Sequence, residues 1–540
     1  MMRLPTKIDV LVVGFGPVGA TVASLLGGQG VSTLVIDRSP ELLTQPRAIA
    51  LDNEALRVLQ LAGLTEDAIA TVAIPRVRMH SPHGGEFACV DTSGSLDGHP
   101  KLVTFFQPEL ERALRARVAT LAPVSTALGV ELTALEERGD KVLATLRHAD
   151  GHTHSLEAAY VVGADGASSR VRQHLGLDFE GRTYAEDWLI IDALNVPRPI
   201  DHVEFLCDPR RPTAHMVAPG GRERWEFMLR PGESRESILT DDSIQRLLSR
   251  WGRPEEMVIE RKAVYRFHAR AAESFRRGHV FLAGDAAHIT PPFVGQGLVS
   301  GLRDAANLSW KLAWVLKRWA APSILDSYDT ERRPHSQAMI DFARRMGRLV
   351  MPENAVTATA LHGLVRLSQL VPPLKASLHG KGLKPEHRYA RGLFVAGHTP
   401  TKLIRGALLP QGWLRDAQGT TRLSDDVFGP SLTLVGFGLD AGAQLDEATR
   451  SAFTARGGRV VQLLHRGQRL HRATHGDCWE DLNTALIPDA APFGWAALVR
   501  PDRTVLHDGP VSEVKRLVHE ALALIGTPPT ADVATPSLHA

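Results

Sequence analysis

A short apolar run followed at once by three spaced glycines is the feature that most constrains the fold of this chain. Residues 8–13 are rich in β-branched side chains, as expected for a buried parallel strand. Gly14 then permits a tight turn, Gly16 lets the backbone approach a pyrophosphate, and Gly19 allows a helix to pack closely on the strand. The chain is therefore predicted to begin with a Rossmann-like α/β domain that binds a dinucleotide.

The residues that follow fit the same unit. A helix is expected over residues 20–26, and its start, beside Pro17 and Val18, would present free N–H groups and a positive dipole end to phosphate. A second strand over residues 31–36 ends at Asp37, the position from which an acid binds the adenosine ribose, and Arg38 comes next.

Two later glycine segments favour FAD over NAD as the dinucleotide. Apolar residues 160–162 precede Gly163-Ala164-Asp165-Gly166, and apolar residues 279–283 precede Gly284-Asp285. Ligands bind beyond the carboxyl ends of the strands in such sheets, so Asp285 is placed to accept hydrogen bonds from a sugar-alcohol chain. A helix expected from Gly297 onward would aim its positive end at the anionic part of a reduced flavin.

This ordered set resembles the class A flavoprotein aromatic hydroxylases, the family that contains p-hydroxybenzoate hydroxylase and phenol hydroxylase, over residues 8–350. Within the family the chain is most similar to the 3-(3-hydroxyphenyl)propionate hydroxylases, on the strings Cys207-Asp208-Pro209, Arg224-Trp225-Glu226-Phe227 and Gly295-Gln296-Gly297-Leu298. The resemblance implies an FAD-dependent monooxygenase that uses O2 and takes NADH or NADPH as a transient cosubstrate. It would hydroxylate a small phenolic acid to a catechol.

The resemblance also assigns cofactor contacts. It implies that Asp165 and Gly166 serve both FAD and the passing nicotinamide, and that Asp285 holds the ribityl chain. Arg47 and Gln107 are expected to touch FAD, although a plain solvated arginine remains an open interpretation of Arg47. The full set expected to bind FAD is Gly14, Gly16, Pro17, Val18, Gly19, Asp37, Arg38, Arg47, Gln107, Asp165, Gly166, Gly284, Asp285, Pro292, Gly295, Gln296, Gly297 and Leu298.

A phenol is a better nucleophile when its hydroxyl loses a proton, so a hydrogen-bonding partner or base is expected in the site. Tyr265 is our candidate, because the resemblance places an active-site tyrosine there, although an ordinary strand residue fits equally well. His215 and Arg224 are candidate substrate contacts, with a surface salt bridge as the alternative for Arg224. Pro291 and Phe293 would form a stiff, partly apolar wall that keeps water from the reacting flavin.

The predicted fold class is α/β, with a Rossmann-like FAD-binding domain and an inserted antiparallel β-sheet substrate domain. The resemblance further implies a C-terminal thioredoxin-like domain. The FAD-binding domain is expected over residues 1–75, 100–190 and 275–350, and the substrate-binding sheet over 76–99 and 190–275. The remaining ranges are a helical connection (351–390), the thioredoxin-like domain (391–525) and a disordered tail (526–540). The thioredoxin-like domain lacks a CxxC pair, which excludes disulfide exchange and leaves a structural role or a homodimer interface.

Composition argues against other classes of function. The formal net charge is +2 and the charged residues are interspersed, so no nucleic-acid partner is expected. Cys89, Cys207 and Cys478 are far apart and have no zinc-site spacing, which predicts a reducing cytoplasm and no metal. Residues 10–28 are apolar enough for a signal peptide or a membrane span, but Asp9 and the ordered glycines oppose both interpretations.

Three functions remain open at this point. The first is the hydroxylation of a phenolic acid, which a deep pocket with a cationic end would favour. The second is a tailoring oxygenase that acts on a polycyclic aromatic natural product, which a wide and open apolar cleft would favour. The third is a non-enzymatic flavin-fold binding protein. Gly436-Phe437-Gly438 imitates a second nucleotide motif but lacks the third glycine, so we interpret it as a segment that binds no nucleotide.

Overall fold

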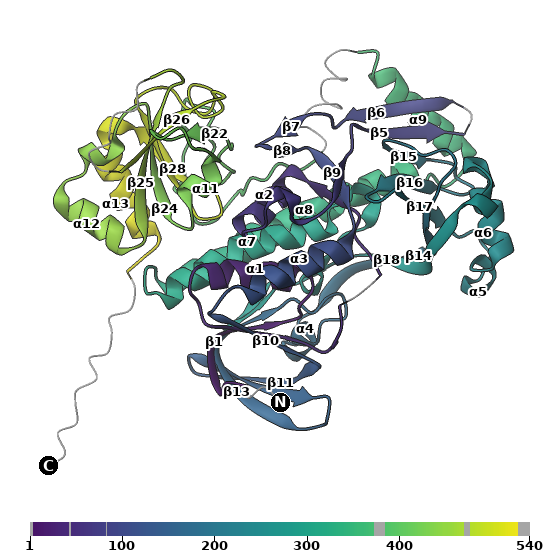
Figure 1. The fold of residues 1–540 in the computed structure, drawn as a ribbon, viewed down its shortest axis with the longest axis horizontal. Coiled ribbons are helices and arrows are strands. Elements are labelled where there is room, and N and C mark those ends of the chain that lie inside the picture. Colours follow the sequence, from purple (N-terminus) through teal and green to yellow (C-terminus); the bar gives the residue numbers. More distant parts are fainter. Residues whose placement is uncertain (1–3, 43–44, 83, 372–383, 469–475, 528–540) are drawn as a thin grey trace. The chain divides into compact units, whose positions relative to one another are not determined.

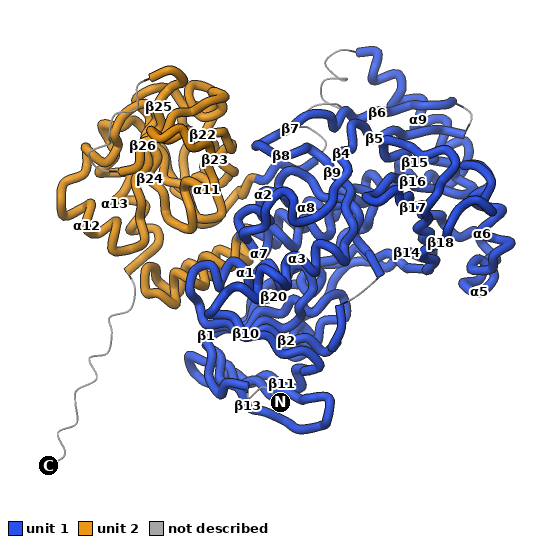
Figure 2. The backbone as a smooth tube through the Cα atoms, in the orientation of Figure 1, with its two compact units in different colours: residues 1–306, 332–387 blue, residues 307–331, 388–540 orange. Residues whose placement is uncertain are grey.

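The computed structural model describes residues 4–42, 45–82, 84–371, 384–468 and 476–527. The chain forms two compact units (Figure 2): unit 1 comprises residues 1–306 and 332–387, and unit 2 comprises residues 307–331 and 388–540. Two of the three boundaries between them fall within helices α7 (Gly297–Leu316) and α8 (Asp326–Val350), and the third lies between residues 387 and 388. Most of the tail expected to be disordered, and part of the expected helical connection, lie outside the described residues.

The first sheet of unit 1 contains the three strands that lead into the glycine motifs. Strand β1 (Lys7–Val13) is parallel to its neighbours β2 (Thr33–Asp37) and β13 (Thr153–Gly163), and β13 is parallel to β20 (Val280–Leu282). The other strands of this sheet are β10 (Val124–Leu128), β11 (Val130–Arg138), β12 (Lys141–His148) and β19 (Arg276–Arg277). Because β1, β13 and β20 are parallel neighbours, the motifs that follow them meet at one edge of the sheet.

Helix α1 (Pro17–Gly28) begins directly after the first glycines. Gly16 is its extended N-cap residue, and no side chain caps its first N–H groups. Proline at the first helical position fits here, since its fixed φ suits the first turn and its missing N–H would have had no partner in the helix. Helix α1 packs against α3 (Gln107–Ala119) beside the sheet (Figure 1). Among the described residues, the other helices wholly within unit 1 are α2 (Asn53–Leu61), α4 (Arg170–His174), α5 (Arg235–Ile238), α6 (Asp241–Leu248) and α9 (Ala355–Ser368).

The second large sheet of unit 1 is mainly antiparallel. In spatial order its strands are β21 (His288–Ile289), β18 (Val258–Ala272), β14 (Phe179–Leu194), β17 (Arg222–Met228), β16 (Thr213–Ala218), β15 (Val203–Leu206), β5 (Arg76–Ser81) and β6 (Gly85–Asp91). Successive side chains of a strand point to opposite faces. On β17, Trp225 and Phe227 therefore join a core with residues of α5 and α6, while Arg224 and Glu226 lie on the other face. Smaller sheets comprise β3 (Ala50–Asp52), β4 (Thr71–Ala73) and β9 (Leu102–Phe105), and β7 (Ser95–Leu96) with β8 (His99–Pro100).

Unit 2 is built on a seven-stranded mixed sheet. Its strands, in spatial order, are β23 (Thr421–Leu423), β22 (Trp413–Arg415), β26 (Asp477–Asp481), β25 (Gly458–Leu464), β24 (Leu432–Phe437), β27 (Trp495–Val499) and β28 (Val505–Pro510). Helices α11 (Ser424–Phe428), α12 (Glu447–Ala455) and α13 (Val514–Leu524) accompany them. Gly436 lies inside β24, where an added Cβ would stand 2.3 Å from the Leu439 carbonyl oxygen, so this segment has no open room for a phosphate.

A buried group of charges, which we call the unit 2 ion cluster, comprises Lys311, Glu331, Arg500 and Asp502. Arg500 donates to both Glu331 oxygens at 2.7 and 3.0 Å and also pairs with Asp502, and Lys311 Nζ lies 2.8 Å from Glu331. Burial opposes the charge on Glu331, but Arg500 and Lys311 outweigh it and hold the pKa of this carboxyl well below its usual value. Burial lowers the pKa of Lys311 to about 8.

The helices and the cysteines bear on two interpretations drawn from the sequence. None of the described helices combines the length and the apolar character that crossing a membrane would require. The three cysteines are unpaired, and burial raises the pKa of all three thiols, that of Cys478 to about 11 and that of Cys207 to about 12.

Candidate active site

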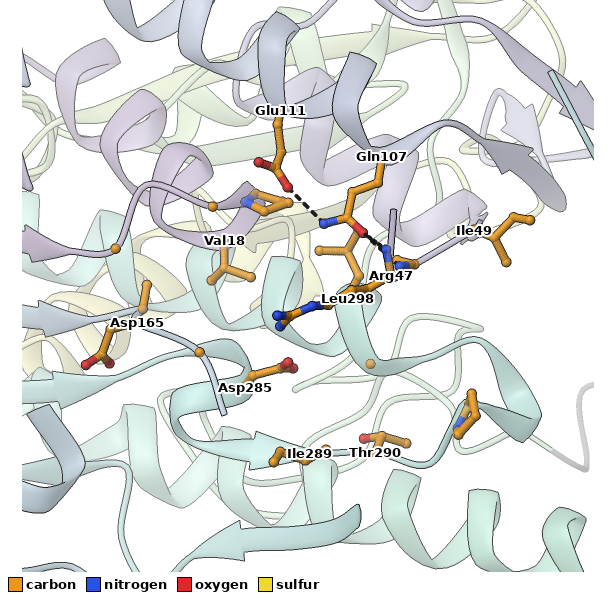
Figure 3. Close-up of a pocket in the computed structure, with 18 of the residues that line it drawn as sticks. Val18, Arg47, Ile49, Gln107, Glu111, Asp165, Asp285, Ile289, Thr290 and Leu298 are labelled. Carbon is orange, nitrogen blue, oxygen red and sulfur yellow. Dashed lines mark hydrogen bonds between the residues drawn. The ribbon is translucent and has the colours of Figure 1, made fainter. Parts of the chain in front are cut away.

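A cavity of about 600 Å³ in unit 1 is lined by residues of both large sheets and of the loops that follow β1, β13 and β20. Gly14 and Gly16 line it from the first motif, Asp165 and Gly166 from the second, and Asp285 from the third. The three segments that are far apart in the sequence thus share one cavity (Figure 3).

Glycine is favoured at the positions of the first motif for two different structural reasons. An added Cβ would stand 2.4 Å from the Ala164 carbonyl oxygen at Gly14 and 1.9 Å from the Gly14 carbonyl oxygen at Gly19, so both positions are closed by backbone. At Gly16 the same Cβ would meet nothing within 4 Å. Open room beside the uncapped start of α1 fits a dinucleotide pyrophosphate, which needs close backbone approach and free N–H groups.

Asp37 ends β2 on the cavity wall with its carboxyl group held in place. The N–H groups of Phe15 and Ser39 donate to its two oxygens at 2.7 and 2.8 Å, which leaves further lone pairs for ribose hydroxyls. Arg38 also lines this part of the cavity. The geometry fits the adenosine end of FAD.

Gln107 positions the loop that carries Arg47. Its side-chain oxygen accepts hydrogen bonds from the N–H groups of Arg47 and Ala48 at 2.7 and 2.8 Å, and its amide nitrogen donates to Glu111 at 2.8 Å (Figure 3). Both Gln107 and Arg47 line the cavity. Arg47 is close enough to Asp285 to offset part of the effect of burial, which raises the pKa of that carboxyl.

The third motif is anchored from behind. The Gly284 N–H donates to Asp304 at 2.9 Å, and Asp304 also pairs with His288 at 2.7 Å and with Arg332 at 2.8 Å. This buried support fixes the turn that presents Asp285 to the cavity. A buried carboxyl group needs donors, and the hydroxyls of a ribityl chain would supply them.

The segment after the third motif also contributes to the wall. Pro292, Phe293, Gly295, Gly297 and Leu298 line the cavity. Two predicted residues of this segment are not among the described lining residues: Pro291 is buried, and Gln296 instead donates to Asp52 at 3.0 Å. Gly19 and Gly284, which were also predicted to bind FAD, are likewise absent from the described lining. Gln296 also accepts a hydrogen bond from Arg303 at 3.0 Å, so these polar contacts draw it away from the cavity.

The second sheet forms the apolar part of the cavity wall. Its contributors include Val77, Trp188, Val203, Phe205, Ala214 and Met216, together with Glu226. Phe293 packs edge-on against Trp188, with the ring centroids 5.9 Å apart. No local sequence motif marks these sheet residues as part of a cavity wall. The alternation along β16 and β17 was the available signal, but it does not say which face meets the cavity.

The structure does not bring His215 or Arg224 to the cavity. His215 lies on the face opposite Ala214 and Met216, fully buried between Glu204 at 3.1 Å and Glu223 at 2.5 Å. Arg224 has a structural partner, since its guanidinium bonds both oxygens of Asp192 at 2.6 and 3.0 Å. It also donates to the carbonyl oxygens of residues 46 and 47, and it therefore braces the Arg47 loop.

Tyr265 likewise stands outside the described lining of the cavity. Its hydroxyl accepts a hydrogen bond from Arg261 at 2.6 Å, and Arg261 also pairs with Asp192 at 3.2 Å. Residues Asp192, Arg224, Arg261 and Glu226 form what we call the cavity-wall cluster. Within it, Asp192 forms ion pairs with the guanidinium groups of both arginines, and Glu226 lines the cavity.

The family comparisons agree with this geometry. Residues 7–343 match the model of the FAD binding domain, and residues 406–524 match the HcaD C-terminal domain. The chain is 36% identical over 514 residues to 3-(3-hydroxy-phenyl)propionate/3-hydroxycinnamic acid hydroxylase 2 of Burkholderia vietnamiensis, covering 92% of this chain and 93% of that protein. It is 32% identical to the hydroxylase of the same name from Escherichia coli K12, covering 98% and 96%.

Solved structures show the same fold. The flavin-dependent monooxygenase PieE, crystallised with FAD and substrate, aligns with a TM-score of 0.79 at 22% identity, covering 98% of this chain and all of that one. OxyS anhydrotetracycline hydroxylase from Streptomyces rimosus aligns with a TM-score of 0.76 at 26% identity, covering 97% and 100%. The mixed α/β sheets of unit 1 are thus those of an FAD-binding monooxygenase fold.

Proposed function

We propose that this chain, which belongs to the family of FAD-dependent aromatic hydroxylases, hydroxylates a phenolic acid to a catechol with NADH or NADPH and O2. The substrate would be 3-(3-hydroxyphenyl)propionate or a close analogue, for aromatic degradation. The observation that carries the proposal is that the wall formed by the glycine motifs and an apolar wall of the second sheet enclose the same cavity. The two walls would hold cofactor and ring against each other.

The residues divide the work of holding FAD. The start of α1 and the open position at Gly16 would bind the pyrophosphate, Asp37 the ribose hydroxyls and Asp285 the ribityl hydroxyls. The start of α7, with Gly297 and Leu298, would stand beside the flavin ring. Bound FAD supplies electron transfer from the nicotinamide and activation of O2.

The apolar side of the cavity would orient the substrate and exclude water. Trp188, Phe205, Met216 and Phe293 offer flat and flexible apolar surface against an aromatic ring. Exclusion of water matters because reducing equivalents are otherwise lost as hydrogen peroxide. Relatives that are 32–36% identical are named for 3-(3-hydroxyphenyl)propionate and 3-hydroxycinnamic acid, which supports a phenolic acid here.

One observation favours a second candidate, a polycyclic aromatic substrate. On the second sheet, the charged residue among the described cavity-lining residues is Glu226, and no described cation lines that wall. A substrate carboxylate would then have to reach Arg47 or another cation near the cofactor. A larger, uncharged ring system has no such requirement.

A substrate panel separates these possibilities. We would follow NADH and NADPH oxidation by the FAD-loaded protein with phenolic acids, neutral phenols and a polycyclic phenol, while measuring catechol and hydrogen peroxide. The proposal expects a phenolic acid to speed oxidation and to yield product without peroxide. Product from the polycyclic compound alone would support the second candidate, and colourless protein without affinity for FAD would overturn both.

We also propose a thioredoxin-like fold without redox activity for the C-terminal domain, with the domain boundaries given above and a cytoplasmic location. A central sheet in which β24, β25 and β26 are parallel and β27 and β28 antiparallel supports that fold. In unit 2 the described cysteine is Cys478, so a disulfide pair has no partner there. A structural or homodimer role follows, which light scattering of the purified protein would test.

A further inference from the structure

Glu226 occupies an unusual position on the cavity wall. It lies in β17, paired with Ile190 of β14 and Ala214 of β16, and only 8% of its surface is exposed. Within the described part of the chain, no residue donates a hydrogen bond to its carboxyl group. Buried polar groups are nearly always hydrogen-bonded, so the donor for a carboxyl group that faces a cavity has to come from what occupies the cavity, either water or a bound ligand.

The charges around Glu226 explain why its carboxyl group is left without a partner. Burial raises its pKa, Asp192 on β14 adds to this effect, and Arg224 on β17 and Arg261 on β18 oppose it. Both arginines are already bonded to Asp192. On the remaining neighbouring strand, β16, the side chains beside it on the cavity are Ala214 and Met216, which do not titrate.

The ligand that fits this group is a hydroxyl donor. A substrate carboxylate would meet a like charge on an ionised Glu226, whereas a phenolic O–H can donate a short charge-assisted hydrogen bond to it. The neighbouring lining residues Trp188, Met216 and Phe293 suit the ring that carries such a hydroxyl.

We propose, on the basis of the function proposed above, that Glu226 is the catalytic residue that receives the proton of the substrate's phenolic hydroxyl. The O–H bond breaks, its electron pair stays on the phenolic oxygen, and the proton moves to a Glu226 carboxylate oxygen. Glu226 is neither oxidised nor reduced in this step. The extra electron density on the ring makes it a better nucleophile. When the catechol forms, the proton returns from Glu226 to the phenolic oxygen, which restores the carboxylate.

The central test compares Glu226→Gln with the wild type, both as full-length, FAD-loaded protein. The amide keeps the size of the side chain but accepts no proton, so we expect kcat for catechol formation to fall about 100-fold or more. FAD content should stay unchanged. Because the ionised carboxylate is the active form, wild-type kcat/KM should fall as pH drops through the raised pKa of Glu226, and this acidic limb should disappear in the variant.

Two further readouts separate a base from a residue that only shapes the cavity. Glu226→Asp keeps a carboxylate and should recover part of the rate. Activity of Glu226→Gln should rise at alkaline pH and with fluorinated phenols, because a substrate that is already ionised in water needs no base. Glu260→Gln is the matched control, since Glu260 lies in the same sheet, is bonded to Arg222 and stands outside the described cavity lining; it should behave as wild type.

The outcomes distinguish the two proposals. A wild type that makes catechol, together with a Glu226→Gln variant of equal kcat and unchanged pH profile, overturns the role of Glu226 alone. A variant that loses activity without recovery by aspartate, alkaline pH or fluorinated substrates also overturns it. A wild-type protein that oxidises NADH or NADPH but hydroxylates no phenol overturns the proposed function itself.

Discussion

Two buried charge clusters in this molecule are closed to different degrees. In the unit 2 ion cluster, Lys311 and Arg500 bond Glu331, and Arg500 also bonds Asp502. In the cavity-wall cluster, Asp192 receives both arginines, and Glu226 faces the cavity without a donor among the described residues. Burial is similar, so it does not distinguish the roles of the clusters. The hydrogen-bonding state of the charged groups distinguishes them. A cluster whose groups all have partners within the protein supports the fold, whereas a cluster with an unpartnered group leaves a place for a ligand.

The largest expected effect is in the closed cluster. Arg500→Met would leave Glu331 and Asp502 buried without their main partner, and we expect a loss of about 3–5 kcal/mol in the free energy of unfolding, measured by urea titration. The control is Arg516→Met, which removes exposed pairs with Glu513 and Glu520 and should change the free energy of unfolding far less. Equal effects of the two changes would remove the contrast between closed and solvated pairs.

The pH dependence of stability gives a second view of the closed cluster. The pKa of Lys311 is lowered from 10.5 to about 8 in the folded state, so the unfolded chain binds this proton more tightly. Stability contributed at this site is therefore reduced below pH 8 and rises as the pH goes from about 8 to 10.5, by at most about 3 kcal/mol. Lys311→Met should lack this rise, and an identical pH profile of unfolding in wild type and variant would contradict the assignment.

Arg224→Met probes the other cluster with a smaller expected effect. Asp192 keeps Arg261, so the fold retains a charge partner, but the carbonyl oxygens of residues 46 and 47 lose a donor. We expect a loss of about 2 kcal/mol in stability and weaker FAD binding through a looser Arg47 loop, measured by flavin fluorescence on titration. Arg222→Met, on the same strand but bonded to the more exposed Glu260, should leave FAD affinity unchanged.

The same contrast between open and closed surroundings applies to the glycines of the first motif. Among the substitutions considered, Gly16→Ala has the smallest expected effect on stability. Gly16→Ala adds a methyl group only to open space, so the melting temperature of the FAD-free protein should not change while FAD affinity falls about tenfold, or about 1.4 kcal/mol. Gly19→Ala places a methyl group against the Gly14 carbonyl oxygen and should destabilise the FAD-free protein instead. Matching melting temperatures for the two variants would show that the distinction between open and closed positions is wrong.

The motif residues were predictable because their geometry is local. A strand followed by glycines or by an acid fixes the backbone within a few residues, and parallel neighbours then bring the three segments together. The family and the FAD-binding monooxygenase fold followed from those motifs and are confirmed by the comparisons. The residues of the second sheet were harder to place, because both of its faces are buried in unit 1.

His215 and Glu226 show this difficulty. They lie on adjacent strands and on opposite faces, and both are polar residues among apolar neighbours. Periodicity predicts that β17 alternates, but a core on one face and a cavity on the other give the same alternation. The two residues differ in their partners, because His215 forms contacts with two glutamates. These contacts depend on strand register, which no local sequence pattern contains.

The pKa values of the three cysteine thiols determine how readily peroxide would oxidise them. Whenever reducing equivalents escape as peroxide inside a flavin enzyme, the nearest thiolates are the first side chains to be damaged. Here burial keeps Cys207 and Cys478 protonated, with pKa values of about 12 and about 11, and also raises the pKa of Cys89. Packing alone thus keeps these thiols in the protonated form, which reacts with peroxide more slowly than a thiolate does.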